Sequence, residues 1–150
     1  MKGIKFAMLT TVEDDGSLHS RPMTTQEIEF DGDLWFFTRA SAPKVSEAQQ
    51  HREVNVAFAD ADKNTYVSAS GKAVLLRDEA KIKELWKPVY KTFFPQGLDD
   101  PDLALLKVSV EKAEYWDSPG NVVSRMFNFA RAYVSKDPSK LGDHAKVDLK

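Results

Sequence analysis

The sequence of 150 residues contains no cysteine and only three histidines. The lack of cysteine excludes disulfides, thiolate catalysis and cysteine-ligated metal sites, and it is typical of a reducing compartment. His19, His51 and His144 lie far apart in the chain, and no two of them have the spacing of metal ligands. We therefore predict no metal site.

Long hydrophobic runs are also missing. No apolar segment is long enough to cross a bilayer, and the first five residues lead into a predicted strand rather than into the apolar region of a signal peptide. We therefore expect a cytoplasmic protein. Hydrophobic residues make up 42% and charged residues 29% of the chain, which indicates a folded domain rather than disorder. The net charge of −2 offers no broad excess of cations for general nucleic-acid binding.

The common catalytic motifs are absent as well. The sequence has no G-x-S-x-G elbow, no P-loop and no G-x-G-x-x-G motif after a strand. Nothing in it resembles the machinery of a self-sufficient hydrolase, and no catalytic residue can be named. If the chain is an enzyme, a cofactor must supply the chemistry.

Short strands separated by turn signals are present instead. The predicted strands are 6–12, 17–23, 25–30, 34–38, 54–59, 65–76, 103–110 and 112–116. We expect the first four to form an antiparallel meander, in which Pro22 restricts the second strand to an edge or a bulge. The small residues at 68–71 indicate either a barrel corner or a surface approached by a flat ring.

Helical patterns are fewer. Helices are expected at 43–50, from Asp78 onward with a kink at Pro88, and at 122–134. The segment after residue 134 is polar, although its last apolar residues could dock on the domain. These patterns predict an α+β chain, mainly β, in which an antiparallel barrel is covered by flanking helices.

The stretch 34–44 has the pattern of a phosphate site. A strand buried on both faces leads into two hydroxyl groups, a helical first turn and an ammonium. We expect Ser41 to cap that helix, so that Thr38, Ser41, Lys44 and the free amides offer the donors that a phosphate dianion requires. The alternative is an ordinary capped helix after a core strand. Arg21 adds a second cation suited to bidentate contacts.

Six stretches, taken in order, resemble the general-stress-protein branch of the pyridoxamine 5′-phosphate oxidase-like family. They are residues 9–12, 20–23, 31–38, 41–45, 66–71 and 113–117, and the resemblance extends to the tail segment 146–149. It implies an antiparallel split β-barrel of the FMN-binding type, and the length and composition of the chain predict a single domain over 1–134 with a polar tail over 135–150. The resemblance also implies FMN as the cofactor and a homodimer with flavin sites between the subunits.

By position, the resemblance assigns Arg21, Thr38, Ser41 and Lys44 to the ribityl phosphate of FMN. The residues that it assigns to the flavin ring are Pro22, Met23, Thr24, Phe37, Ser68, Ser70 and Trp116. The backbone of 22–24 is expected to face the ring, and Phe37 is expected to help wall the site. Ser68 and Ser70 lie on the strand that borders the flavin, and Trp116 reaches it from the neighbouring subunit.

The chain departs from this family in two ways. Only five residues precede Phe6, where the family commonly has a helix, and the C-terminal arginine and histidine segment of true pyridoxamine phosphate oxidases is missing. We therefore do not predict vitamin B6 synthesis. The resemblance favours an FMN-dependent oxidoreductase with a nicotinamide or other small reductant. The alternative is a module that binds, stores or senses FMN without turnover.

Overall fold

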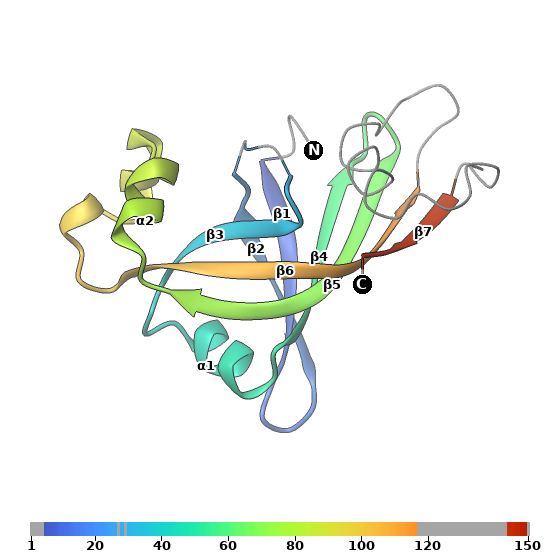
Figure 1. Ribbon diagram of the computed structural model, residues 1–150, viewed down its shortest axis with the longest axis horizontal. Coiled ribbons are helices and arrows are strands. Elements are labelled where there is room, and N and C mark those ends of the chain that lie inside the picture. Colours follow the sequence, from blue (N-terminus) through green and yellow to red (C-terminus); the bar gives the residue numbers. More distant parts are fainter. Residues whose placement is uncertain (1–4, 27, 29, 117–143, 150) are drawn as a thin grey trace.

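The computed structural model describes residues 5–26, 28, 30–116 and 144–149. Its strands form one antiparallel sheet in the order β2-β1-β4-β5-β6-β3, with β7 paired to β6 (Figure 1). The strands are β1 Phe6–Val12, β2 Leu18–Thr24, β3 Asp33–Arg39, β4 Glu53–Asp60, β5 Thr65–Leu76, β6 Leu103–Trp116 and β7 His144–Asp148. The helices are α1 Pro43–Gln50 and α2 Glu79–Leu85, followed by the 3-10 turns η1 Pro88–Thr92 and η2 Gly97–Asp99.

The sheet curls into a half-barrel because its longest strands bend. β6 has 14 residues, of which the first half pairs with β3 and the second half with β7. Opposite the middle of β6, the register of β5 shifts between Ser70 and Gly71. A Cβ atom on Gly71 would lie 2.1 Å from the backbone oxygen of Ser109, so the strands approach closely here. The small residues of β5 therefore mark a barrel corner at Gly71.

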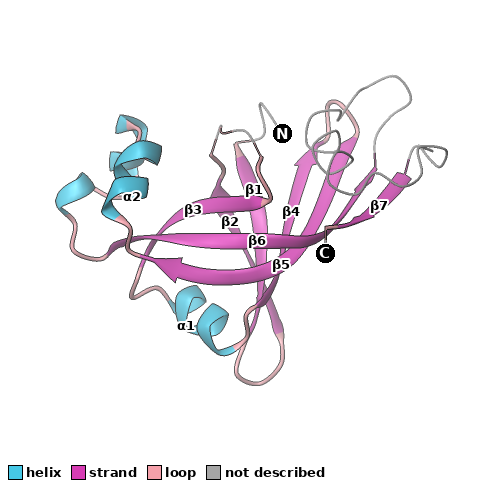
Figure 2. Ribbon diagram, viewed as in Figure 1, coloured by secondary structure: helices cyan, strands magenta, loops and turns pink. Residues whose placement is uncertain are grey.

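The hydrophobic core fills the concave side of this half-barrel. Alternate residues of the strands bury Leu9, Phe36, Val56 and Leu106, as expected for side chains that point to one face of a sheet. α1 lies against β1 and β5 (Figure 2), and its Val45 and Ala48 are buried. A second, smaller cluster lies under α2 and η1. It contains Phe37, Ile82, Leu85, Tyr90, Phe94, Leu103 and Leu105.

The convex side of the sheet carries both apolar and hydroxyl side chains. We call it the outer face and define it by the residues Phe6, Met8, Thr10, Asn55, Tyr66, Ser68, Ser70 and Trp116, which alternate with core residues along β1, β4, β5 and β6. Phe6 is 55% exposed and Trp116 is 40% exposed. The outer face therefore holds large apolar side chains in contact with solvent.

Several predictions for the strands are confirmed, and others are wrong. β2 is an edge strand with Pro22 opposite Met8, as its proline predicted. The predicted meander is wrong, because residues 25, 26, 28 and 30 are not in a strand. β3 pairs with β6 and not with the segment that precedes it in the chain. The two strands expected at 103–110 and 112–116 are one continuous strand, β6. Near the C-terminus, Val147 pairs with β6 as part of β7, so this segment does dock.

The helical predictions have mixed outcomes too. Asp78 caps α2 by accepting a hydrogen bond from the amide of Lys81 at 3.1 Å, but the helix ends at Leu85 and Pro88 begins a 3-10 turn instead of a kink. Proline has no N–H to donate within a helix, and its ring clashes with the carbonyl group one turn earlier, which explains the break. The helix expected at 122–134 lies outside the described residues.

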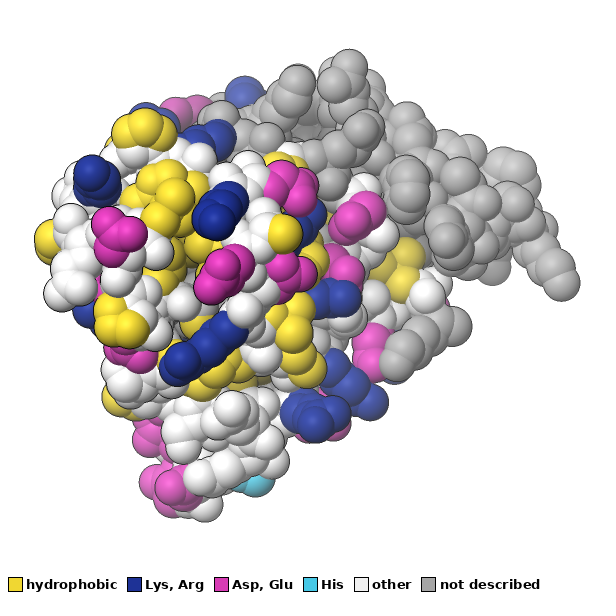
Figure 3. All heavy atoms as spheres, turned by 60° about the vertical axis from the view of Figure 1, so that its left-hand side comes forward, with side chains coloured by type: hydrophobic (Ala, Val, Ile, Leu, Met, Phe, Trp, Pro, Cys, Tyr) yellow, Lys and Arg dark blue, Asp and Glu magenta, His cyan; other side chains and the backbone are white. Residues whose placement is uncertain are grey.

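The surface around the second cluster is mixed in character. Figure 3 shows hydrophobic side chains among charges of both signs on this side of the molecule. Val89, Phe93 and Leu98, from η1, η2 and the turn between them, are the large exposed apolar residues here. Among the described helices, none has the length and hydropathy of a membrane span.

Candidate functional site

The candidate site lies where the two ends of the sheet meet. Among the described strands, β2 pairs with β1 alone and β3 pairs with β6 alone, so the ladder leaves a seam between β2 and β3. Arg21 of β2 contacts Glu47 of α1, the helix that follows β3 in the chain and packs against β1 and β5. The two predicted cations, Arg21 and Lys44, are therefore brought to one place from opposite ends of the sheet.

Arg21 is held by two partners on the concave side. Its Nη2 donates to Oε2 of Glu47 at 2.8 Å, and its Nη1 donates to Oγ1 of Thr11 at 2.8 Å. The Thr11 hydroxyl in turn donates to the same Glu47 oxygen at 2.5 Å. Arg21, Thr11 and Glu47 thus form a closed triangle of hydrogen bonds, and together with Lys44 we call them the cradle.

Lys44 completes the cradle from the first turn of α1. Its side chain is half-buried, and no ion pair or hydrogen bond to its ammonium occurs within the described part of the chain. Burial lowers the pKa of this ammonium, the nearby Arg21 guanidinium lowers it further, and Glu47 opposes both. A half-buried cation without an acceptor, next to a second cation, is the arrangement that an anion would stabilise.

Glu47 stays ionised in this environment. Burial raises the pKa of its carboxyl, but the hydrogen bonds from Thr11 and Arg21 and the charges of Arg21 and His19 outweigh burial, so the pKa lies below its ordinary value. The cradle therefore combines two cations with one carboxylate, and it retains a net positive charge.

Ser41 does not cap α1, which is a correction to the sequence-based expectation. The N-cap residue is Ala42, with no side-chain cap. The Ser41 hydroxyl donates to Oδ2 of Asp102 at 2.5 Å, and its amide donates to Oδ1 of the same carboxylate at 3.0 Å. These hydrogen bonds hold the pKa of Asp102 below its ordinary value. Thr38 is fully buried, and its hydroxyl donates to the backbone oxygen of Arg39 at 3.3 Å.

The predicted ring residues divide between the two faces of the sheet. Ser68 and Ser70 lie on the outer face, where Nδ2 of Asn55 donates to their hydroxyl oxygens at 2.8 and 3.0 Å. On the same face, the hydroxyls of Thr10 and Ser20 are 2.6 Å apart. Since Arg21 follows Ser20 in β2, its side chain points to the opposite, concave side. One copy of the chain therefore does not bring the cradle and the two serines together.

The other ring residues occupy three places. Pro22 and Thr24 lie on the edge strand β2, and the Met23 side chain is buried in the main core. Trp116 ends β6 on the outer face, opposite Tyr66. Phe37 packs in the second cluster, where its ring centroid lies 5.5 Å from that of Trp86 and 5.0 Å from that of Tyr90.

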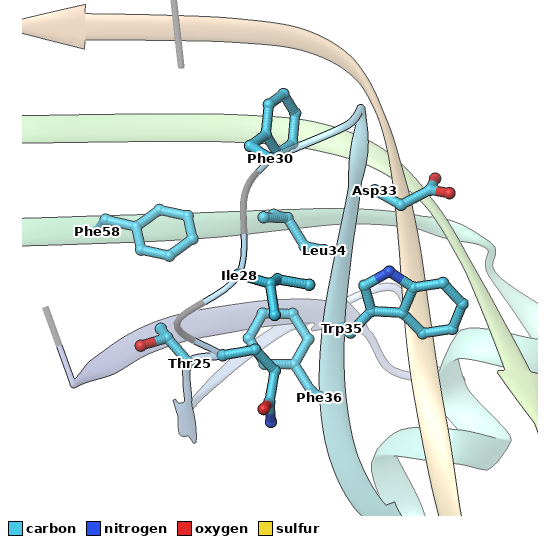
Figure 4. Close-up of a pocket in the computed structure, with 9 residues that line it drawn as sticks. Thr25, Ile28, Phe30, Asp33, Leu34, Trp35, Phe36 and Phe58 are labelled. Atoms are coloured by element: carbon cyan, nitrogen blue, oxygen red, sulfur yellow. The ribbon is translucent and has the colours of Figure 1, made fainter. Parts of the chain in front are cut away.

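A separate hollow lies between β3 and the segment before it. Ile28, Leu34, Phe36 and Phe58 point toward one another there (Figure 4), and none of the predicted site residues lines it. Gln26 also lines it. Its Oε1 accepts from the hydroxyl of Tyr90 at 2.8 Å, whereas its buried Nε2 has no partner among the described residues. The hollow is therefore mainly apolar, with Thr25, Gln26 and Asp33 as the polar residues of its wall.

A group of possible metal ligands borders the cradle. One ligand atom from each of Glu13, His19 and Glu47 lies within 4.8 Å of the others. The Glu47 oxygen Oε2 already accepts hydrogen bonds from Arg21 and Thr11, and the guanidinium beside it repels a cation. These contacts favour an ion-pair network over a metal site.

Sequence reasoning missed the residues that organise the cradle. Glu47 lies three positions after Lys44, a spacing that places two side chains on one helix face and was the available signal. Thr11 occupies a core-facing position of β1, where a buried hydroxyl needs a partner. Asp102 gave no local signal, because its contact with Ser41 joins residues 61 positions apart.

Comparisons with known proteins agree with this architecture. The family model "Pyridoxamine 5′-phosphate oxidase like" matches residues 1–139. Protein bli-3 of Neurospora crassa is 26% identical over 149 residues, which cover 93% of this chain and 71% of that protein.

Solved structures give the same result. The general stress FMN/FAD binding protein of Xanthomonas citri has 30% sequence identity and a TM-score of 0.68, and the match covers 82% of this chain and 87% of that one. A Clostridium acetobutylicum protein related to general stress protein 26, of the pyridoxinephosphate oxidase family, has 22% identity and a TM-score of 0.68, with 83% and 88% covered. The fold is thus the split barrel of these proteins, and the chain belongs to the pyridoxamine 5′-phosphate oxidase-like family.

Proposed function

We propose that this chain binds FMN, with the phosphate in the cradle, and that it is a small flavin-dependent oxidoreductase. The observation that carries the proposal is the pair of cations at the seam, of which Lys44 has no acceptor within the described residues. An anion with several oxygens would accept hydrogen bonds from both cations, whereas the amides of Ser41, Ala42 and Val45 at the start of α1 already donate to Asp102, Arg39 and Ala42. The similarity to the general stress FMN/FAD binding protein of Xanthomonas citri supports a flavin as the source of that anion.

The side chains of the candidate site fit the binding of a cofactor better than they fit an active site that works without one. Bound FMN would accept electrons from a small reductant, such as a nicotinamide, and pass them to an acceptor. The residues of this chain would bind the phosphate through Arg21 and Lys44 and orient the ring against the backbone of 22–24. Because Ser41 is engaged by Asp102, we give the phosphate contacts to Arg21 and Lys44 first.

Replacing Lys44 with methionine tests the cradle as the phosphate site. We expect FMN affinity to fall about 10- to 100-fold, because one charge-assisted phosphate contact is lost, while riboflavin affinity changes less than about threefold. Fluorescence titration of both flavins measures this difference, and Lys91→Met, on η1, is the matched control. Equal losses for FMN and riboflavin would place the phosphate elsewhere.

We further propose a homodimer in which each flavin contacts both subunits. The outer face supports this proposal, because it exposes Phe6 and Trp116 and carries Ser68 and Ser70 on the side of the sheet away from the cradle. A second copy would cover these apolar side chains and bring its own Ser68, Ser70 and Trp116 to the flavin held by the first.

Subunit mixing tests the shared site. Lys44→Met copies and Trp116→Ala copies are each expected to bind FMN weakly, whereas a heterodimer of the two has one site with both residues intact. Mixing after mild denaturation should therefore restore tight binding to about one quarter of all sites, measured by titration of the refolded mixture. Mixtures that bind no better than their components would contradict the shared site.

The alternative function is a module that binds FMN without turnover. It is favoured by the cradle itself, in which Arg21 and Glu47 are engaged with each other rather than poised for proton transfer. Anaerobic reduction of the bound flavin by NADH or NADPH, followed by steady-state turnover with an added acceptor, separates the two functions. Turnover no faster than that of free FMN would favour the binding module.

A further inference from the structure

Glu47 occupies an unexpected place for a carboxylate, since it lies inside a site that we assign to an anion. Its side chain is 14% exposed and that of Arg21 is 15% exposed, so the two charges meet largely away from water. The Oε2 atom accepts from both Arg21 and Thr11, and Arg21 also donates to Thr11. Three hydrogen bonds therefore fix the plane of the guanidinium relative to β1 and α1.

This arrangement leaves most of the guanidinium available. An arginine side chain has five N–H donors, and its hydrogen bonds to Thr11 and to Glu47 use one donor on each terminal nitrogen. The remaining donors are held in a fixed plane and can meet a phosphate without further ordering of the side chain. A fixed orientation reduces the entropy that an arginine loses when it binds an anion.

Glu47 also acts on the second cation. Burial and the Arg21 charge both lower the pKa of Lys44, and Glu47, one helical turn away, is the group that raises it. The other charges near this carboxylate are His19, which acts on Glu47, and Glu13, whose Oε1 lies 2.8 Å from Nδ1 of His19. Without Glu47, two cations would face each other with no compensating charge between them.

We propose that Glu47 is a positioning residue of the cradle, which holds the guanidinium of Arg21 in place and supplies the negative charge that balances the two neighbouring cations. The inference rests on the proposed function, because it assigns these two cations to the flavin phosphate. Removing the carboxylate therefore has opposite effects in different pH ranges. At a pH where Lys44 is protonated even without Glu47, removing the carboxylate raises FMN affinity, because a negative charge near the phosphate is lost. At higher pH, removing it lowers FMN affinity, because Lys44 loses its charge.

The test compares FMN with riboflavin as the pH rises from about 7 to 10.5, at constant ionic strength. The ratio of the riboflavin Kd to the FMN Kd reports the phosphate contact alone, because ionisation of the flavin ring affects both ligands equally. Arginine stays protonated throughout this range. The pH at which the ratio begins to fall therefore marks the deprotonation of Lys44 in the free protein, and Lys44→Met should abolish that fall.

In Glu47→Gln, which keeps the size and one acceptor oxygen, we expect the fall to begin about one pH unit lower than in the wild type. At pH 7 the variant should bind FMN within about threefold of the wild type or more tightly. Glu47→Asp retains the charge and should restore most of the alkaline range. Glu84→Gln, which removes another helical carboxylate paired with a lysine, at 3.0 Å from Lys81, is the matched control and should leave the onset unchanged.

Each result has a distinct meaning. An earlier onset in Glu47→Gln, restored by Glu47→Asp, supports the inference. An unchanged onset in Glu47→Gln overturns it while the proposed function stands, provided that the wild type prefers FMN over riboflavin. A wild-type ratio near one at every pH overturns the proposed phosphate site and the inference together. Thermal melting without ligand verifies that each variant is folded.

Discussion

Gly71→Ala is expected to lower the free energy of unfolding by about 3 kcal/mol or more, which is the upper end of the cost of overpacking. The added Cβ would lie 2.1 Å from the backbone oxygen of Ser109 and 2.9 Å from the Cα of Val110. Both atoms belong to the backbone of β6, which cannot rotate away as a side chain can. The strands must therefore separate at the barrel corner, and the pairing on either side of it weakens.

Urea unfolding followed by circular dichroism measures this loss. Gly16→Ala is a useful comparison, because that glycine has φ +84 but no atom within 4 Å of an added Cβ. It should lose about 1–2 kcal/mol from backbone strain alone. A Gly71→Ala variant as stable as the wild type would show that β5 and β6 do not approach as described.

Arg21→Leu is expected to reduce FMN affinity about 100-fold or more, because it removes the guanidinium of the cradle and leaves Lys44 as its remaining cation. It should also lower the free energy of unfolding by about 2–3 kcal/mol, since Glu47 and the Thr11 hydroxyl lose their partner in a largely buried place. Calorimetric titration and urea unfolding measure the two effects on the same protein.

The double variant Arg21→Leu with Glu47→Gln separates these effects. Removing the stranded carboxylate should recover about half of the lost stability or more, because a neutral amide costs less to bury than a charge. FMN affinity should stay low, because the guanidinium is still missing. Recovery of both properties would mean that Arg21 acts on FMN only through the fold.

The local parts of the fold were predictable from the sequence. The strand at 6–12, the helix at 43–50 and the start of a helix at Asp78 depend on neighbouring residues, and the structure confirms them. Pro22 has no N–H to donate to a ladder, which restricted β2 to an edge or a bulge, and the structure places β2 at the edge. These features need no knowledge of distant partners.

The pairing of β3 was not predictable in the same way. A hairpin with the preceding segment is the simplest arrangement for a short connection, but Asp33 pairs with Ser109 instead. Both β3 and β6 are strongly apolar, and a strand buried on both faces needs a neighbour that is also buried. Which strand becomes that neighbour depends on the three-dimensional fold, so the local sequence of β3 does not reveal it.

The candidate site shows the same division. Arg21 and Lys44 stood out as cations next to special backbone features, and the structure brings them together. Ser41 was assigned from helix-capping chemistry, but its amide and hydroxyl are taken by Asp102, whose position depends on the loop before β6. Glu47 was missed because an exposed-looking glutamate in a helix usually pairs with a neighbouring lysine.

The seam between β2 and β3 has a consequence for how a ligand reaches the cradle. Among the described strands, the ladder runs from β2 through five pairings to β3 and does not close on itself. In the described part of the chain, no backbone hydrogen bond of the sheet joins these two ends, and they are held together by side chains: Gln26 contacts Tyr90, and β2 and β3 contribute Met23 and Phe36 to the same core. Entry of a ligand at this place is therefore opposed by side-chain packing and not by strand pairing.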